Sequence, residues 1–184
     1  MTNAIAFEPE VWRLRSRRSV TVRAVRPDDQ ARLQAAMRHL SDESRYMRFM
    51  GFTRELSPQL LDRATHPVPG RELQLIVVTG EGDAETIVAG ARYAADASGD
   101  CEFAVTVLDE WRRLGLARRL LDTLIRRAQM RGFTRMTGYV LATNTGMLAL
   151  ARRMGFVQVP SREDPTVRVV RRDLTTGPMR VAGR

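Results

Sequence analysis

The sequence contains no lysine, one cysteine and two histidines, and each shortage narrows what the chain can be. The single cysteine, Cys101, excludes an internal disulfide, and the sequence has no Cys/His group with the spacing of a zinc site. No apolar run approaches the roughly 20 residues that are needed to cross a bilayer. The first residues, MTNAIAFEPEVW, lack the basic and then apolar layout of a secretory signal. We therefore expect a soluble, cytoplasmic protein that holds no metal and does not associate with membranes.

The net charge of +9 comes entirely from arginine. Basic charge can indicate nucleic-acid binding, but these arginines are spread along the chain and are not interleaved with aromatic residues. An acidic ligand or an acidic protein partner would use the same charge. We expect no nucleic acid among the partners, and a flat salt dependence would exclude one.

Length and patterning indicate one domain with a proper core, since 43% of the 184 residues are hydrophobic and no repeat or linker interrupts them. We divide the chain into a loosely attached lead-in (1–18), a domain (19–174) and a flexible tail (175–184). Strands are expected at 19–25, 71–79 and 86–94, with short helices at 31–40 and 41–49 and a last strand at 167–174. Three antiparallel strands followed by strand, helix, strand and helix make a mixed α/β fold, with a mostly antiparallel central sheet and helices on both faces.

The stretch from Cys101 to Phe156 organises the rest of the chain. Cys101–Val107 is apolar and β-branched, which predicts a strand buried on both faces. After a polar break, the segment RRLGLA opens an amphipathic helix that ends at Arg131-Gly132. A strand that leads through a glycine turn into a helix can bind an anion, because the helix N-terminus presents unpaired N–H groups. The alternative is that Gly115 only eases a tight turn, and neither the P-loop nor the dinucleotide fingerprint is present.

The second half of this stretch adds a strand at Met136–Leu141 and a helix that begins after Asn144 and ends at Gly155. The order strand, R-x-x-G-x-A, helix, strand, N-x-x-M, helix, G-F resembles the acetyl-CoA-binding half of the GNAT superfamily of N-acetyltransferases. The resemblance implies acetyl-CoA as co-substrate, with strand main chain pairing to the pantetheine amides and the glycine turn holding the diphosphate. Asn144 is an N-cap and, by resemblance, also reaches the coenzyme arm. The coenzyme site assigned on this basis comprises Val105, Thr106, Val107, Arg112, Arg113, Leu114, Gly115, Leu116, Ala117, Arg118, Asn144 and Met147.

A second resemblance lies in the segment LSDESRYMRF. Its S-x-E-S-x-Y-x-R-F run is similar to the entry region of bacterial GNAT protein acetyltransferases that modify lysines of acyl-CoA synthetases and related enzymes. This implies a protein lysine as acceptor, and a chain without lysine offers no side chain of its own for modification. The residues alone indicate a helix that packs on the sheet, with Tyr46 and Phe49 in the core and Arg45 and Arg48 on the surface.

Acetyl transfer to an amine requires a base, because a lysine side chain is normally protonated at pH 7. Glu102 is the candidate: it is an acid at the start of an apolar strand, where burial would raise its pKa, and the protein-acetyltransferase branch carries its base within a similar E-F-A run. The alternative is a strand-edge glutamate that pairs with an arginine. Cys101 precedes Glu102 and points to the opposite face, so it is not expected to carry the acyl group.

One departure from the superfamily concerns Ala151, which occupies the position where many members have the tyrosine that protonates the leaving thiolate. Either the thiolate leaves without a positioned acid, or another group supplies the proton. We expect direct transfer from acetyl-CoA to a protein lysine. The alternatives are a small-molecule amine as acceptor and a non-catalytic acyl-CoA-binding module. The oligomeric state stays open, a dimer included.

Overall fold

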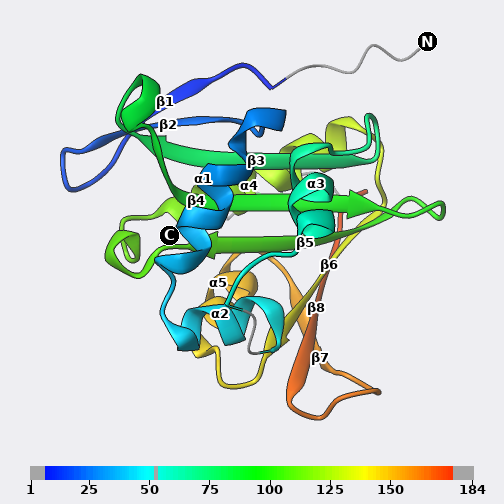
Figure 1. Ribbon diagram of the computed structural model, residues 1–184. Coiled ribbons are helices and arrows are strands. Elements are labelled where there is room, and N and C mark those ends of the chain that lie inside the picture. The colour runs from blue at the N-terminus through cyan, green and yellow to red at the C-terminus, as the bar shows by residue number, and fades with distance from the viewer. Residues whose placement is uncertain (1–6, 52–53, 176–184) are drawn as a thin grey trace.

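A computed structural model describes residues 7–51 and 54–175 of the chain. Its centre is an eight-stranded sheet of order β1-β2-β3-β4-β5-β6-β8-β7 (Figure 1). All neighbouring strands are antiparallel except β5 and β6, so the predicted mostly antiparallel mixed sheet is confirmed. The strands are β1 Glu10–Arg13, β2 Ser19–Ala24, β3 Glu72–Thr79, β4 Thr86–Ala95, β5 Asp100–Val107, β6 Arg135–Leu141, β7 Val157–Pro160 and β8 Val167–Asp173.

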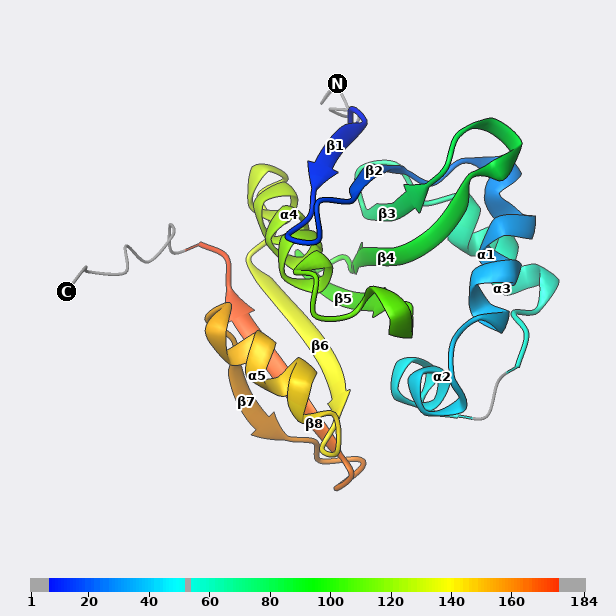
Figure 2. The same cartoon turned by 90° about the vertical axis from the view of Figure 1, so that its left-hand side faces the viewer.

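Helices cover both faces of this sheet. Helices α1 and α3 lie on one face and α4 lies on the other (Figure 2). Three of the helices begin at side-chain caps, since Ser41, Ser57 and Asn144 each accept an amide N–H of the following turn. The α-helices are α1 Gln30–Arg38, α2 Asp42–Phe49, α3 Pro58–Thr65, α4 Leu116–Met130 and α5 Thr145–Arg153, with 3₁₀ turns η1 Pro27–Asp29, η2 Gly82–Ala84 and η3 Asp109–Trp111. None of the helices among the described residues is long and apolar enough to span a bilayer.

The core has two layers because the central strands are apolar on both sides. On β3, Leu75 and Val77 belong to the larger cluster, which α4 and α5 complete. Ile76 and Val78 alternate with them and form the smaller cluster under α1. The side chains at four-residue spacing in α4 are almost fully buried, and each contributes about 1.5–3 kcal/mol relative to an exposed position.

The predicted elements from residue 19 onward are confirmed within one or two residues, whereas the predicted lead-in needs correction. Glu10–Arg13 pairs with β2 as strand β1, and Trp12 is buried under the guanidinium of Arg119, 4.2 Å from its ring centroid. A four-residue strand is too short to show an alternating pattern, so the sequence gave no signal for it. Most of the predicted flexible tail, 176–184, lies outside the described residues.

Strands β5 and β6 separate after a short paired segment, and this separation positions the site. Their parallel pairing covers only Asp100–Glu102 of β5 and Arg135–Thr137 of β6. Beyond it the two strands diverge and open a wedge between two parts of the sheet (Figure 2). The edge of β5 that faces β6 therefore carries backbone groups without a partner strand over the rest of its length.

Candidate active site

The wedge between β5 and β6 holds a cavity of about 1210 Å³. Its wall includes β5, β6, the 112–118 turn, α2 and the first turn of α5. All twelve residues that the sequence analysis assigned to the coenzyme site line it: Val105, Thr106, Val107, Arg112, Arg113, Leu114, Gly115, Leu116, Ala117, Arg118, Asn144 and Met147. The structure thus brings this set together at one place.

The turn before α4 has the geometry of an anion site. Gly115 is the N-cap of α4 and has a φ of 87°, which side chains of L-residues rarely allow. A Cβ built on Gly115 meets no atom within 4 Å, so the space above this backbone is free for a ligand. Arg112, Arg113 and Arg118 line the cavity here, where the first turn of the helix leaves N–H groups unpaired.

Two further features fit a long ligand that carries amides. The free edge of β5 from Phe103 to Val107 offers N–H and C=O groups with which an extended chain can pair like an added strand. At the far side of the wedge, Asn144 Oδ1 accepts the Met147 N–H at 3.0 Å, so the predicted capping role is confirmed. The same asparagine lines the cavity.

Glu102 lies where the wedge begins, and it lines both the large cavity and a second, smaller one. The expected burial of this carboxylate is wrong: Glu102 is exposed, because no helix covers β5 at this point and the strand borders a cavity instead. Strand register aligns Glu102 with Ala94 of β4 on one side and Thr137 of β6 on the other. Among the described residues no ion pair includes Glu102, so its carboxylate faces the cavities without an arginine partner.

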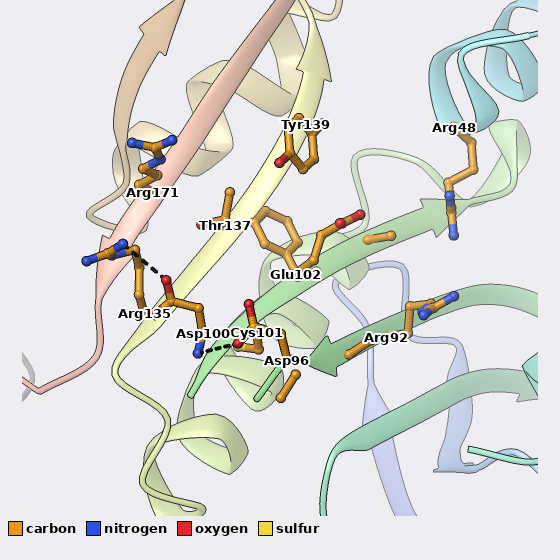
Figure 3. A pocket seen from close by; sticks show the side chains of 14 residues that line it. Arg48, Arg92, Asp96, Asp100, Cys101, Glu102, Arg135, Thr137, Tyr139 and Arg171 are labelled. Carbon is orange, nitrogen blue, oxygen red and sulfur yellow. Dashed lines mark hydrogen bonds and ion pairs between the residues drawn. The ribbon is translucent and has the colours of Figure 1, made fainter. Parts of the chain in front are cut away.

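The smaller cavity, of about 550 Å³, lies on the Glu102 side of the sheet (Figure 3). Arg48 reaches it from the last turn of α2, and Arg92 reaches it from β4. Burial, together with repulsion from Arg92, lowers the pKa of Arg48 to about 10, while the negative charge of Glu102 opposes the shift. Arg48 was expected at the surface, but it is half-buried and lines both cavities.

The residue-only interpretation of α2 needs a wider correction. Tyr46 was expected in the core but is 39% exposed. Arg45, expected at the surface, instead directs its guanidinium to the Leu40 carbonyl at 2.8 Å and closes the end of α1. The reason is that α2 packs beside a cavity and not flat on the sheet, so the polar side of this helix is also its inner side.

Sequence reasoning missed a link between α2 and the 112–118 turn. Ser44 Oγ donates to Asp109 at 2.7 Å and accepts from Arg112 at 2.6 Å, and the Ser41 N–H donates to the other oxygen of Asp109 at 3.0 Å. These bonds hold the pKa of Asp109 below its ordinary value, although partial burial works in the opposite direction. The S-x-E-S run was the available signal for Ser44, whereas nothing in the sequence indicated that Arg92 faces a cavity.

Two residues of interest lie outside the reacting region. Ala151 is fully buried in the core between α5 and the sheet, so this position supplies no proton donor to the cavities. Cys101 is buried on the face opposite Glu102, as predicted, and burial with the nearby acids Asp100 and Asp96 raises the pKa of its thiol to about 12. Among residues 7–51 and 54–175, no group of three or more potential metal ligands occurs.

Comparison with known proteins now assigns the fold. Residues 34–156 match the model of the acetyltransferase (GNAT) family. The chain belongs to this family. It is 33% identical over 164 residues to acetyltransferase PA5475 of Pseudomonas aeruginosa, with 88% of each protein covered. The GNAT domain of S. lividans PAT superposes with a TM-score of 0.81 at 29% identity, covering 90% of this chain and 96% of that domain. A cAMP-binding acyltransferase from Mycobacterium smegmatis shares the fold, with a TM-score of 0.61 at 23% identity over 95% of this chain and 50% of that one.

The family membership makes the protein a GNAT acetyltransferase, and the family uses acetyl-CoA as its co-substrate. The features of the large cavity fit that molecule: an arginine-rich helix N-terminus for the diphosphate and a free strand edge for the pantetheine amides. The acceptor and the residues that perform the chemistry belong to the proposal below.

Proposed function

We propose that this protein transfers the acetyl group of acetyl-CoA directly to the side-chain amine of a protein lysine, with Glu102 as general base. The observation that carries the proposal is the position of Glu102. Its carboxylate lines both the coenzyme-sized cavity and the smaller cavity beside it, at the point where β5 and β6 separate. A base in this place lies between the two substrates.

The chemistry needs such a base. With a usual lysine pKa of about 10.4, fewer than about one side chain in a thousand is neutral and nucleophilic at pH 7. Glu102, directly or through one water, accepts a proton from the amine while the nitrogen attacks the thioester carbonyl carbon. The carbon–sulfur bond then breaks, and the coenzyme leaves as a thiolate that takes up a proton. A main-chain N–H on the free edge of β5 would stabilise the developing oxyanion.

A positioned acid for the thiolate is not required for this sequence of steps. A thiol with a pKa near 8.5 is a good leaving group at neutral pH, and its thiolate can take a proton from water. The buried Ala151 is in accord with transfer of this kind. A covalent acyl-cysteine route would need Cys101, whose thiol is buried and only weakly acidic.

Three observations support a protein as the acceptor. The S-x-E-S-x-Y-x-R-F run of α2 resembles that of bacterial protein acetyltransferases, and the GNAT domain of S. lividans PAT, a protein acetyltransferase, is similar over nearly the whole chain. The net charge of +9 favours an acidic protein partner. A small-molecule amine is the second candidate, because about 550 Å³ is within the usual range for small-molecule pockets.

The experiment uses radiolabelled acetyl-CoA and an extract of the source organism, with label followed separately in protein and small molecules. We expect label in specific protein bands with the unmutated enzyme, and a loss of at least about a hundred-fold in rate for Glu102→Gln, the usual contribution of a general base. Glu110→Gln, a change of the same kind at an exposed glutamate of η3, is the control and should retain the rate.

Other outcomes would change the proposal. Label that enters only small molecules would move the acceptor to a free amine. Binding of the coenzyme without any labelled product would contradict the transferase proposal and leave a binding role. If Glu102→Gln retains the full rate, another group is the base.

A further inference from the structure

The smaller cavity beside Glu102 contains more positive than negative charge. Its lining includes three acids, but two of them are already engaged. Asp100 accepts from Arg135 Nη1 at 3.1 Å and from Thr134 Oγ1 at 3.1 Å. Asp96 accepts the N–H and the hydroxyl of Ser98 at 2.8 and 2.6 Å. Glu102 is therefore the one acid of this cavity, among the described residues, whose carboxylate is free to meet the remaining arginines: Arg48, Arg92 and Arg171.

Two of these arginines lie together on one side of Glu102. Arg92 is opposite Ala104, and Ala94 is opposite Glu102, so Arg92 is the diagonal neighbour of Glu102 on the same face of the sheet. Arg48 extends from α2 toward the same region (Figure 3). Arg171, from β8, lies on the other side of Glu102 (Figure 3).

Neither Arg48 nor Arg92 has an anionic partner within residues 7–51 and 54–175. Arg48 contacts the ring of Phe49 at 4.8 Å from its centroid, and Arg92 makes no hydrogen bond or ion pair there. The two guanidinium groups are close enough to repel each other, which lowers the pKa of Arg48. Half-buried like charges without a counter-ion are unfavourable, and a bound anion would remove this cost.

Glu102 cannot supply that anion and also act as a base. Its carboxylate is not within ion-pair distance of either arginine, and a carboxylate held in a permanent arginine fork would be a weak proton acceptor. The arrangement leaves a place for a second carboxylate, brought by the acceptor, about as far from Glu102 as the arginines themselves. Arginine is suited to this role because its planar fork binds a carboxylate with two parallel hydrogen bonds.

We propose that Arg48 and Arg92 form a subsite for a carboxylate of the acceptor, so that the enzyme prefers a lysine with an aspartate or glutamate beside it. This inference rests on the proposed function, since it names the kind of lysine that the enzyme selects. The arginines orient the acceptor next to Glu102, and they take no part in proton transfer.

The test uses pairs of synthetic peptides that contain one lysine and differ only by glutamate or glutamine at the neighbouring positions. For the unmutated enzyme we expect kcat/KM to be roughly ten-fold or more higher for the glutamate peptides, in line with a charge-assisted hydrogen bond. Arg48→Gln and Arg92→Gln should bring this ratio close to one. Arg92→Glu should reverse it in favour of peptides with arginine at the same positions, a result that a merely structural role would not produce.

Arg171→Gln is the matched control, because it removes the same charge from the other side of the same cavity and should leave the ratio unchanged. The KM for acetyl-CoA, measured for every variant, reports whether the variant is folded and binds the coenzyme. Equal rates on both members of each peptide pair would overturn the subsite while the proposed function stands.

If the enzyme acetylates no peptide but does acetylate free amines, the proposed acceptor fails and the subsite is tested by itself. The pair is then lysine and cadaverine, which is lysine without its carboxylate. A preference for lysine that Arg92→Gln abolishes supports the subsite, and equal rates on the two amines overturn it.

Discussion

The side chain of Arg112 donates a hydrogen bond of 2.6 Å to the hydroxyl of Ser44 and so joins the coenzyme turn to α2. Asp109 completes the junction, since its two oxygens accept from the Ser44 hydroxyl and from the Ser41 N–H. One end of this junction lines the large cavity, and α2 carries Arg48 into the smaller one. The arrangement therefore connects the parts of the protein that would hold the two substrates.

Ser44→Ala removes the centre of this junction. We expect the KM values for acetyl-CoA and for the acceptor both to rise several-fold, with a loss of about 1 kcal/mol in the free energy of unfolding for the broken hydrogen bonds. Ser57→Ala is the control. It removes the N-cap of α3 at a similar cost of about 1 kcal/mol, but Ser57 lies outside both cavities and its loss should leave both KM values unchanged. Unchanged KM values in Ser44→Ala would show that the junction only stabilises the fold.

The stability effect of Ser44→Ala should also depend on pH. The hydrogen bonds lower the pKa of Asp109 in the folded protein, so their contribution is present above the unfolded value of about 4 and is lost as the pH falls through the folded value. The difference in unfolding free energy between the two proteins should therefore shrink below about pH 4. Urea denaturation at a series of pH values measures it, and a difference that persists at low pH would contradict this account.

Gly115→Ala separates backbone strain from loss of ligand space. Gly115 and Gly132 flank α4 with φ values of 87° and 78°, and a Cβ at either position meets no atom within 4 Å. The alanine variants should each lose roughly 1 kcal/mol of stability, because alanine is disfavoured at positive φ. Gly115 lines the large cavity and Gly132 does not, so only Gly115→Ala should also raise the KM for acetyl-CoA. Equal KM values for the two variants would contradict an anion site at Gly115.

The parts of the site that could be predicted from the sequence are those made by adjacent residues. The 112–118 turn and the following helix are local, because the glycine, the arginines and the leucines at four-residue spacing together specify a helix N-terminus. Asn144 could be assigned as a cap for the same reason. Such features need only the backbone conformation of a few consecutive residues.

The acceptor side could not be predicted, because it depends on contacts between distant segments. Arg92 faces Glu102 through the register of two strands, and Arg48 arrives through the packing of α2 beside the sheet. The exposure of Glu102 has a similar cause: the local apolar sequence favours burial, whereas the separation of β5 from β6 opens a cavity at this residue. Strand β1 was missed because only its pairing with β2 identifies it.

Cys101 should be unreactive in the folded protein. Its thiol is 2% exposed, and burial raises its pKa to about 12, so the thiolate that alkylating reagents require is almost absent at pH 8. We expect iodoacetamide to label Cys101 only after denaturation, as mass spectrometry would measure. Cys101→Ala should keep kcat within about two-fold, because direct transfer does not use the thiol. A large loss of kcat in a folded Cys101→Ala protein would support an acyl-cysteine intermediate instead.

The buried network of Arg23, Asp29 and Glu85 should matter more for stability than any exposed ion pair. Arg23 donates to both oxygens of Asp29 at 2.8 Å, and Asp29 is fully buried. Although burial opposes it, the bond from Arg23 lowers the pKa of Asp29, so this stabilisation is complete above about pH 4 and is lost as the pH falls further.

Asp29→Ala leaves the guanidinium of Arg23 buried with only Glu85 as partner, which should reduce the free energy of unfolding at pH 7 by about 3 kcal/mol or more. Glu55→Ala breaks the exposed pair with Arg38 and should cost less than about 1 kcal/mol. Chemical denaturation at pH 7 compares the two variants. Similar losses would mean that Glu85 alone satisfies Arg23, and the role of Asp29 would then be limited to its hydrogen bond with the Arg26 N–H at the start of η1.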